Sequence, residues 1–236
     1  AAMETIRMNH QWMMDDRVGL GITTGNPCYE DQVEGVVRFA KGRDLFLFNA
    51  VLNAKHEFLR MYAGHWVKAH LEACKFVREV YGVPIPREAD LVIVSCGGYP
   101  KDTNAYQMQK TMDNARIAVK KGGAVILVAE CREGSGNQKF EDTCRRLGSY
   151  DAIVKELKEH FVMGAKKAFA VTRNMQKAPY FLVSSLDPKL AKELMFAGCV
   201  TTIEEALALV RPIVGEHPSV ILMPEGSLTV PLLPEN

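Results

Sequence analysis

A glutamine and a lysine three residues apart are the strongest candidates for ligand chemistry in this sequence. Gln107 and Lys110 follow an apolar run, Leu91–Cys96, and a short glycine-containing loop. The run is rich in β-branched residues and predicts a strand, and a helical pattern begins near Asn104, so the segment forms a corner of the kind that binds ligands in α/β proteins. Residues three apart share one helix face. A carboxamide and an ammonium group beside a positive helix N-terminus suit a small carboxylate or phosphate.

The loop between strand and helix is part of the same candidate site. Gly97 and Gly98 come directly after the strand and Tyr99 follows them. The loop is longer than a simple turn requires, which favours a ligand-binding role. The alternative is a purely structural turn, because glycine pairs commonly follow strands.

A second glycine-containing loop, residues 130–136, follows the next predicted strand. In a parallel sheet it opens at the same edge as the first loop. Arg132 could therefore supply a further contact to an anion, or it could be a solvated surface arginine. The sequence leaves both readings open.

Other kinds of site find little support in the sequence. The six histidines form no HxH or HExxH spacing, and His65 and His70 lie five apart, which does not align them on one helix face. No Ser–His–Asp or Cys–His set stands out, and Cys96 at a strand end is expected to be packed. There is no Walker-type loop and no dinucleotide fingerprint.

Composition narrows the class of protein. The chain has 236 residues, 47% hydrophobic and 24% charged, with a formal charge of +1. That balance argues against a nucleic-acid binder, which normally carries a basic face. No apolar stretch reaches transmembrane length, so no membrane partner is expected. The six cysteines form no CxxC pair and several lie in apolar segments, which favours reduced thiols and a cytoplasmic protein.

The first residues predict a helix without a capping residue and show no initiator methionine and no signal peptide. We therefore expect that the chain is cut from a longer protein. After this helix the patterns predict a first block of elements: a strand at Arg17–Thr23, a helix at Tyr29–Lys41, a strand at Asp44–Leu52, a short helix capped by Asn53 and a helix at His65–Tyr81. Pro84 and Pro86 then indicate a domain boundary, giving domains at 1–86 and 87–236.

The second block alternates strands and helices. Strands are predicted at Leu91–Cys96, Ala124–Glu130, Tyr180–Ser184 and Ser219–Met223, and helices at Asn104–Lys120, Gln138–Leu147, Ile153–His160, Gly164–Arg173, after Asp187-Pro188, and at Ile203–Val210. Lys121-Gly122-Gly123 is expected to terminate the helix before it. This alternation predicts an α/β fold with a largely parallel sheet covered on both faces.

Several ordered motifs make the chain similar to one known family. They include Gly25-Asn26-Pro27, Val51-Leu52-Asn53, Val80-Tyr81-Gly82-Val83-Pro84, Ala89–Asp102, Tyr106-Gln107-Met108-Gln109-Lys110 and Val128–Gly134. As a set they resemble the nickel-pincer lactate racemase family, from residue 1 to about residue 175 and more weakly beyond. The resemblance implies two α/β domains with the active site between them. The chain would then be the tail of the first, cofactor-binding domain and a complete C-terminal domain that contacts substrate.

The resemblance also implies roles for individual residues. The segment Glu4–His10 matches the one that carries the family's nickel-ligating histidine, which makes His10 the candidate metal ligand. Gln107 and Lys110 match contacts to the substrate carboxylate, in agreement with the anion site that their residue types and spacing predict. The cofactor-tethering lysine and the catalytic histidines of the family lie upstream of His10, so no catalytic residue is expected in this chain.

The implied reaction is the racemisation or epimerisation of a 2-hydroxy acid. In the family, hydride passes from C2 of the substrate to a nickel-pincer pyridinium nucleotide and returns to either face. This piece alone is expected to be inactive without the missing N-terminal portion of the same protein. A family position that is often aromatic or histidine is occupied here by Lys166 or Lys167, which leaves the particular hydroxy acid open.

Two other classes of function remain as alternatives. The chain could be a non-catalytic anion- or nucleotide-binding α/β module, in which Lys110→Ala would abolish stabilisation by the ligand. It could also be a structural or oligomerisation domain, in which Gln107 and Lys110 simply face solvent. Alanine at either position would then change the free energy of unfolding by no more than about 0.5 kcal/mol.

Overall fold

The computed structural model describes residues 3–159 and 163–234. The chain divides into two compact units, Ala1–Gly82 and Val83–Asn236, which we call the N-terminal and C-terminal units. The division falls four residues before the boundary that the two prolines predicted at residue 86. Among the described residues, no helix combines the length and apolar character needed to cross a membrane.

Two helices open the N-terminal unit. They are α1 (Met3–Gln11), followed by the short 3-10 helix η1 (Trp12–Met14), and α2 (Pro27–Ala40). Asn26 caps α2, because its side chain accepts hydrogen bonds from the backbone amides of Cys28 and Tyr29. The buried side chain of Asn9 donates 2.9 Å hydrogen bonds to the Cys28 carbonyl and to Asp31, and so ties α1 to α2.

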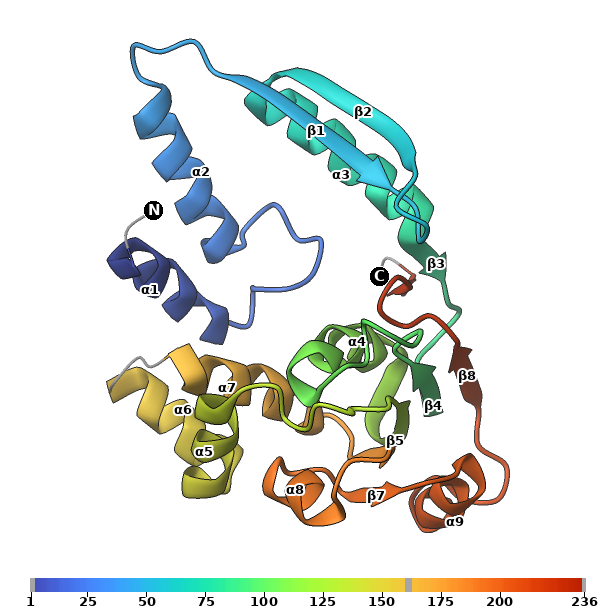
Figure 1. Ribbon diagram of the computed structural model, residues 1–236. Coiled ribbons are helices and arrows are strands. Elements are labelled where there is room, and N and C mark those ends of the chain that lie inside the picture. The colour runs from blue at the N-terminus through green and yellow to red at the C-terminus, as the bar shows by residue number, and fades with distance from the viewer. Residues whose placement is uncertain (1–2, 160–162, 235–236) are drawn as a thin grey trace. The chain divides into compact units, whose positions relative to one another are not determined.

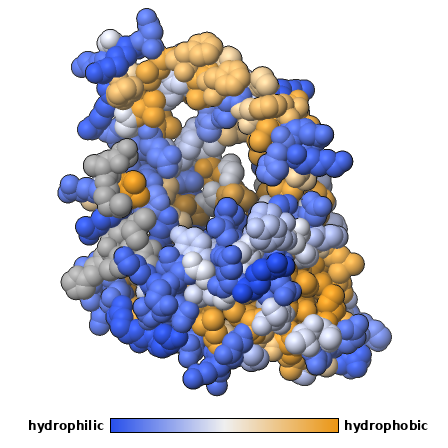
Figure 2. Space-filling view, in the orientation of Figure 1, coloured by the Kyte–Doolittle hydropathy of each residue, from blue (hydrophilic) through white to orange (hydrophobic). Residues whose placement is uncertain are grey.

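A β-hairpin and a helix complete this unit. Strands β1 (Phe46–Leu52) and β2 (Phe58–His65) pair antiparallel, and α3 (Trp66–Tyr81) packs along one face of the pair (Figure 1). Leu47, Asn49 and Val51 point to the helix side. The alternate residues form an outer face that is almost wholly apolar and mostly exposed: Phe46, Phe48, Phe58 and Met61. Figure 2 shows hydrophobic side chains gathered over this hairpin.

The strand predicted at Arg17–Thr23 does not form. The segment instead makes turns, with the amide of Val18 bonded to the Asp15 carbonyl and the amide of Ile22 bonded to the Gly19 carbonyl. Gly21 adopts a φ of 72°, which breaks an extended run. The apolar residues of this segment therefore suggested a strand, whereas the chain turns at Gly21.

The short helix predicted after Asn53 is also wrong. Asn53 closes the turn between β1 and β2 instead, because its side-chain oxygen accepts from the amides of Lys55 and Glu57 at 2.9 and 3.0 Å. His56 has a φ of 62°, the left-handed conformation of a tight turn. Asparagine can cap a turn as well as a helix, so the residue alone did not distinguish the two.

The C-terminal unit is built on a five-stranded parallel sheet, which confirms the predicted fold class. Its strand order is β7-β6-β5-β4-β8, with bounds Gly198–Val200, Tyr180–Val183, Val119–Val128, Ala89–Ser95 and Val220–Met223. Two short strands, β3 (Gly82–Pro84) and β9 (Val230–Leu232), pair with each other outside this sheet.

Helices cover both faces of the sheet. The helix α9 (Ile203–Val214) lies on one face, where Ala206 and Val210 join a core with Leu91, Ile126 and Phe181 (Figure 1). The helix α4 (Ala105–Ala118) covers the other face and packs against α7 (Met163–Met175). The remaining helices are α5 (Gln138–Leu147), α6 (Tyr150–Glu159) and α8 (Pro188–Glu193). His160, the last residue of one predicted helix, lies outside the described residues.

The predicted end of α4 was wrong by a few residues. Lys121-Gly122-Gly123 does not terminate the helix, because α4 ends at Ala118 and β5 begins at once with Val119. Gly123 leaves no room for a side chain, since an added Cβ would overlap the Asp90 carbonyl of β4. Gly123 thus allows the close approach of β4 and β5 and does not end a helix.

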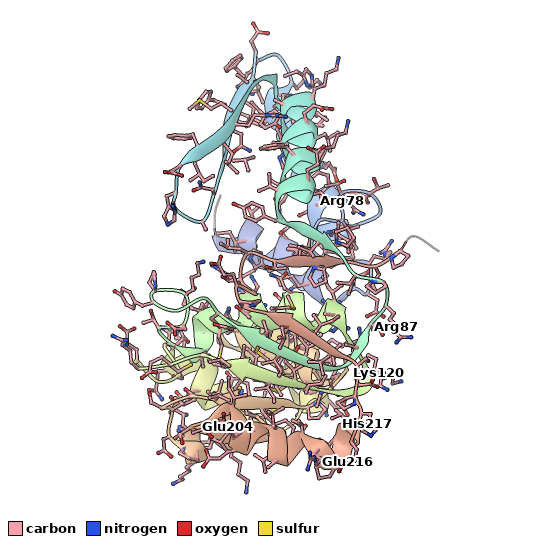
Figure 3. All side chains as sticks on the ribbon, turned by 90° about the vertical axis from the view of Figure 1, so that its right-hand side faces the viewer. Arg78, Arg87, Lys120, Glu204, Glu216 and His217 are labelled. Atoms are coloured by element: carbon pink, nitrogen blue, oxygen red, sulfur yellow. The ribbon has the colours of Figure 1, made fainter. Side chains whose placement is uncertain are left out.

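The two ends of the sheet differ in what they carry. Figure 3 shows Arg87, Lys120 and His217 at the edge where β4, β5 and β8 begin. At this edge Asp90 pairs with Lys120 and accepts hydrogen bonds from the amide and hydroxyl of Ser219. These contacts lower the pKa of Asp90 well below its usual range. The opposite edge, at the carboxyl ends of the strands, carries the two glycine loops and the start of α4.

Candidate functional site

The corner between β4 and α4 forms as predicted. β4 ends at Ser95, Gly97 and Gly98 adopt φ values of 87° and 76°, and α4 begins at Ala105. Asn104 is the N-cap, and its side-chain oxygen accepts from the amide of Gln107 at 3.1 Å. The cap fixes the direction in which the first turn presents its side chains.

The backbone amides at the start of α4 are all used within the protein. Those of Ala105 and Tyr106 donate to the carbonyls of Gly134 and Ser135 at 3.0 Å, and those of Gln107 and Met108 donate to Asn104. These amides are therefore not available to an anion, and any anion bound at this corner would be contacted by side chains.

Asn104 therefore stabilises the start of α4 and with it the positions of Gln107 and Lys110. We expect Asn104→Ala to lower the free energy of unfolding by about 1 kcal/mol, the usual cost of losing an N-cap. Urea denaturation followed by circular dichroism measures this. Asn137→Ala, at the N-cap of α5, is the matched control and should cost a similar amount without affecting ligand binding. A loss at Asn104 much below that at Asn137 would contradict the role of the cap.

The second loop meets the first at the same edge, as predicted. The amide of Cys131 donates to the Asp102 carbonyl at 2.8 Å and that of Glu133 donates to the Thr103 carbonyl at 3.0 Å. Arg132 lies over the ring of Tyr99, 5.5 Å from its centroid. Tyr99 is 71% exposed and contacts this arginine. The structure therefore links Tyr99 of the first loop to Arg132 of the second loop.

Gln107 and Lys110 are both exposed on the first turns of α4. They stand three residues apart on a regular helix, so their side chains lie on the same side of it. A ligand can thus approach both groups from solvent.

A polar network beside these two residues joins α4 to α7, and the sequence did not predict it. The Lys167 ammonium donates to Gln109 Oε1 at 2.8 Å and lies 3.9 Å from the centroid of the Tyr106 ring. The Gln109 amide donates in turn to Asp113, and Asn174 donates to the other Asp113 oxygen at 2.8 Å. The four-residue spacing of Gln109 and Asp113 could have indicated a shared face, but nothing in the sequence places α7 against it.

Burial and neighbouring charge perturb both ionisable groups of this network. Burial, opposed by Asp113 and assisted by the nearby Lys110 and Lys166, lowers the pKa of Lys167 to about 8. Lys167 is still mostly protonated at pH 7. Burial raises the pKa of Asp113 from its usual value. Perturbed groups of this kind gather at functional sites more often than elsewhere.

The cysteines near the corner are inert thiols. None of the six cysteines forms a disulfide, and Cys96 is fully buried next to the end of β4. Burial raises the pKa of Cys96 to about 11 and that of Cys131 to about 12. Because the thiolate is the reactive form, the structure confirms that Cys96 is packed rather than nucleophilic.

His10 belongs to a separate cavity in the N-terminal unit. The cavity has a volume of about 870 Å³, lies between α1 and α2, and is lined by His10, Asn9, Asp31 and Arg38 among others. Within the described residues, no group of three or more His, Cys, Asp or Glu side chains could hold a metal ion. Any metal held here would need ligands besides His10.

Comparison with known proteins decides the family. Residues 85–230 match the family model described as "Lactate racemase C-terminal domain". This stretch covers more than half of the 236 residues and includes the whole corner described above. The chain belongs to the lactate racemase family.

Two curated relatives support the assignment. Over 142 residues the chain is 36% identical to lactate racemase of Thermoanaerobacterium thermosaccharolyticum and 34% identical to lactate racemase of Lactiplantibacillus plantarum. Each match covers 59% of the chain and 32% of the relative. The chain thus matches about a third of the length of these relatives.

Solved structures agree with the fold. The lactate racemase apoprotein from Thermoanaerobacterium thermosaccharolyticum superposes with a TM-score of 0.87 at 28% identity, over 98% of the chain and 55% of that protein. A protein from Thermotoga maritima superposes with a TM-score of 0.64 at 16% identity, over 90% of the chain and 55% of that protein, and supports the fold alone.

Proposed function

We propose that this family member is the substrate-contacting part of an enzyme that interconverts the stereoisomers of a 2-hydroxy acid. The observation that carries the proposal is the exposed pair Gln107 and Lys110 on the first turns of α4, within the stretch that matches the lactate racemase C-terminal domain. Because the chain covers 55% of the solved relative, the reaction is proposed for the full-length parent and this piece alone is expected to be inactive.

The two side chains suit a carboxylate. The Lys110 ammonium forms a charge-assisted hydrogen bond to one carboxylate oxygen, and the Gln107 amide donates to the other. With the carboxylate held at two points, C2 of the substrate keeps one position, while rotation about the C1–C2 bond still allows either face to be presented. Such positioning lowers the barrier because the reacting groups no longer have to be brought together by chance.

The proposed cofactor is the nickel-pincer pyridinium nucleotide, which supplies the hydride acceptor for C2. His10 fits such a group, because it lines a cavity of about 870 Å³ and a neutral imidazole is a good ligand for nickel. A cavity of this size can also hold a nucleotide-sized molecule. The hydrogen bonds of Asn9 to α2 hold the helix that carries His10.

The outer face of the β1–β2 hairpin is evidence for a further proposed partner, which is the N-terminal portion of the same protein. Four large apolar side chains, Phe46, Phe48, Phe58 and Met61, are more than half exposed on that face. A two-stranded hairpin is marginal by itself, and an exposed apolar face of this kind marks a contact surface. We infer that further elements of the parent's first domain cover it.

A substitution on this face should change the stability of the full-length parent but not that of the 236-residue chain. In the full-length parent we expect Phe48→Ser to lower the free energy of unfolding by about 2 kcal/mol, the value of burying one phenylalanine. In the 236-residue chain the same change should leave stability nearly unaltered and reduce self-association in analytical ultracentrifugation.

Leu222→Ser is the matched control, because Leu222 is 68% exposed in the C-terminal unit. It should change little in either protein. Equal effects of Phe48→Ser on the parent and on the chain would show that the parent does not cover this face.

Incubation of the cofactor-loaded parent with one pure enantiomer tests the function itself. Chiral chromatography should show the opposite enantiomer accumulating for at least one 2-hydroxy acid, and the 236-residue chain should show no conversion. If the loaded parent leaves every 2-hydroxy acid tried optically unchanged, the proposed function is wrong.

A further inference from the structure

A buried amide lies on the same face of α4 as the proposed carboxylate contacts. Asn114 follows Gln107 by seven residues and Lys110 by four, so the three side chains stand on one side of the helix. Gln107 and Lys110 are exposed, whereas Asn114 is only 4% exposed. The face that is open to a ligand in the first turns of α4 is therefore covered one turn further on.

The segment that follows β8, residues 224–229, provides this cover. The Asn114 side-chain amide donates to the Gly226 carbonyl at 2.7 Å. Gly226 has no room for a side chain, because an added Cβ would overlap Val94 of β4 and Thr111 of α4. The segment is thus wedged between the strand and the helix of the corner, and β9, which comes next in the chain, packs against α4.

The same segment also holds the start of the glycine loop. The Gly226 amide donates to the Ser95 carbonyl at 2.8 Å, and the Ser227 hydroxyl donates to the Cys96 carbonyl at 3.0 Å. Ser95 and Cys96 come directly before Gly97. Gly226 therefore bonds to the end of β4 through its amide and to α4 through its carbonyl, so one residue connects the two sides of the proposed site.

Asn114 is a costly residue at its position in the helix. Within the described part of the chain, its buried side-chain oxygen has no hydrogen-bond partner, and an unpaired buried acceptor is unfavourable. Asparagine is also a poor helix former. An apolar side chain of similar size would avoid both costs but could not donate to Gly226. Residues that break local rules in this way are expected at functional or strained sites.

We propose that Asn114 is a positioning residue for the carboxylate contacts, because through Gly226 it fixes α4 relative to the loop that follows β4. This inference rests on the proposed function. Gln107 and Lys110 belong to one helix, so the spacing between them does not depend on this bond. The place where they hold the carboxylate does depend on it. Asn114 therefore controls the position of C2 rather than the affinity for the acid.

Asn114→Leu in the cofactor-loaded parent tests this role, because it removes the donor and keeps a side chain of similar size. We expect kcat to fall at least about tenfold, since a misplacement of about 1 Å can cost about 100-fold in rate. KM should change by less than about threefold, because both carboxylate contacts remain. The inhibition constant of 2-hydroxy-2-methylpropanoate, an unreactive analogue, should also change by less than about threefold.

Ser227→Ala is the second variant, and it removes the hydrogen bond from the same segment to Cys96. Ser227 is only half-buried, so this variant is expected to fold, and kcat should fall about threefold at nearly constant KM. Thr143→Val is the matched control. Thr143 is also a buried polar residue in a helix, but its hydroxyl donates only to the Lys139 carbonyl of its own helix α5. Thermal unfolding shows whether each variant is folded.

An unchanged kcat in a folded Asn114→Leu protein would overturn the inference. A rise in KM that accounts for the whole loss of kcat/KM would do the same, because Asn114 would then act on affinity. If Asn114→Leu does not fold, an unchanged kcat in Ser227→Ala overturns the inference. These results leave the proposed function intact, whereas failure of the unaltered loaded parent to convert any 2-hydroxy acid would contradict the proposed function and this inference with it.

Discussion

Replacing Lys110 with methionine should lower kcat/KM of the loaded parent at least about 100-fold, whichever 2-hydroxy acid it uses. A charge-assisted hydrogen bond is worth about 1.5–3 kcal/mol, and 2.7 kcal/mol corresponds to about 100-fold in rate. The carboxylate also loses one of its two fixed points, so the orientation of C2 is lost with the affinity. Steady-state kinetics with a chiral assay measures the change.

The same substitution should have little effect on the fold. Lys110 is exposed and its side chain lies outside the core of the C-terminal unit, so we expect a change of no more than about 0.5 kcal/mol in the free energy of unfolding. Gln107→Glu is the companion variant and should be equally severe, because it places a negative charge beside the substrate carboxylate. Lys192→Met on α8 serves as control. Retention of full activity in Lys110→Met would remove this residue from the site.

The second large effect concerns Gly136. Gly136 has a φ of 73°, and an added Cβ would overlap the side chain of Asn104, the N-cap of α4. We expect Gly136→Ala to lower the free energy of unfolding by about 3 kcal/mol. The left-handed backbone accounts for about 1–2 kcal/mol, and displacement of the cap accounts for about 1 kcal/mol more.

A double-mutant cycle tests whether the cost of Gly136→Ala depends on the Asn104 cap. Gly148→Ala is the matched control, because Gly148 has a φ of 61° and nothing within 4 Å of an added Cβ. It should cost only the backbone term, about 1–2 kcal/mol. In the Asn104→Ala background, Gly136→Ala should also fall to about that value, since the cap is already lost. Equal costs of Gly136→Ala in both backgrounds would show that the loop and the cap are independent.

The sequence predicted best where local pattern and chain order act together. The parallel sheet followed from apolar runs alternating with amphipathic segments, and the corner at β4 and α4 followed from glycines, a cap and a polar helix start. The strand predicted at Arg17–Thr23 does not form, because the chain turns at Gly21, which the apolar pattern does not reveal. The helix predicted after Asn53 does not form, because an asparagine can close a hairpin as well as begin a helix.

Contacts between segments that are far apart along the chain could not be predicted from the sequence. Gln109 and Lys167 are 58 residues apart and meet only because α7 packs on α4. The occupation of the α4 amides by the second loop depends in the same way on how two loops meet at the edge of the sheet. Sequence patterns identify Gln107 and Lys110 as a pair, whereas the charge around them comes from tertiary packing.

A crystal structure of the loaded parent with 2-hydroxy-2-methylpropanoate gives the most direct test of the carboxylate site. This acid has no hydrogen on C2 and cannot react, so it should stay bound as a substrate analogue. We predict that its carboxylate lies within about 2.7–3.2 Å of both the Lys110 ammonium and the Gln107 amide nitrogen. A carboxylate bound elsewhere, with both side chains pointing to solvent, would contradict the account.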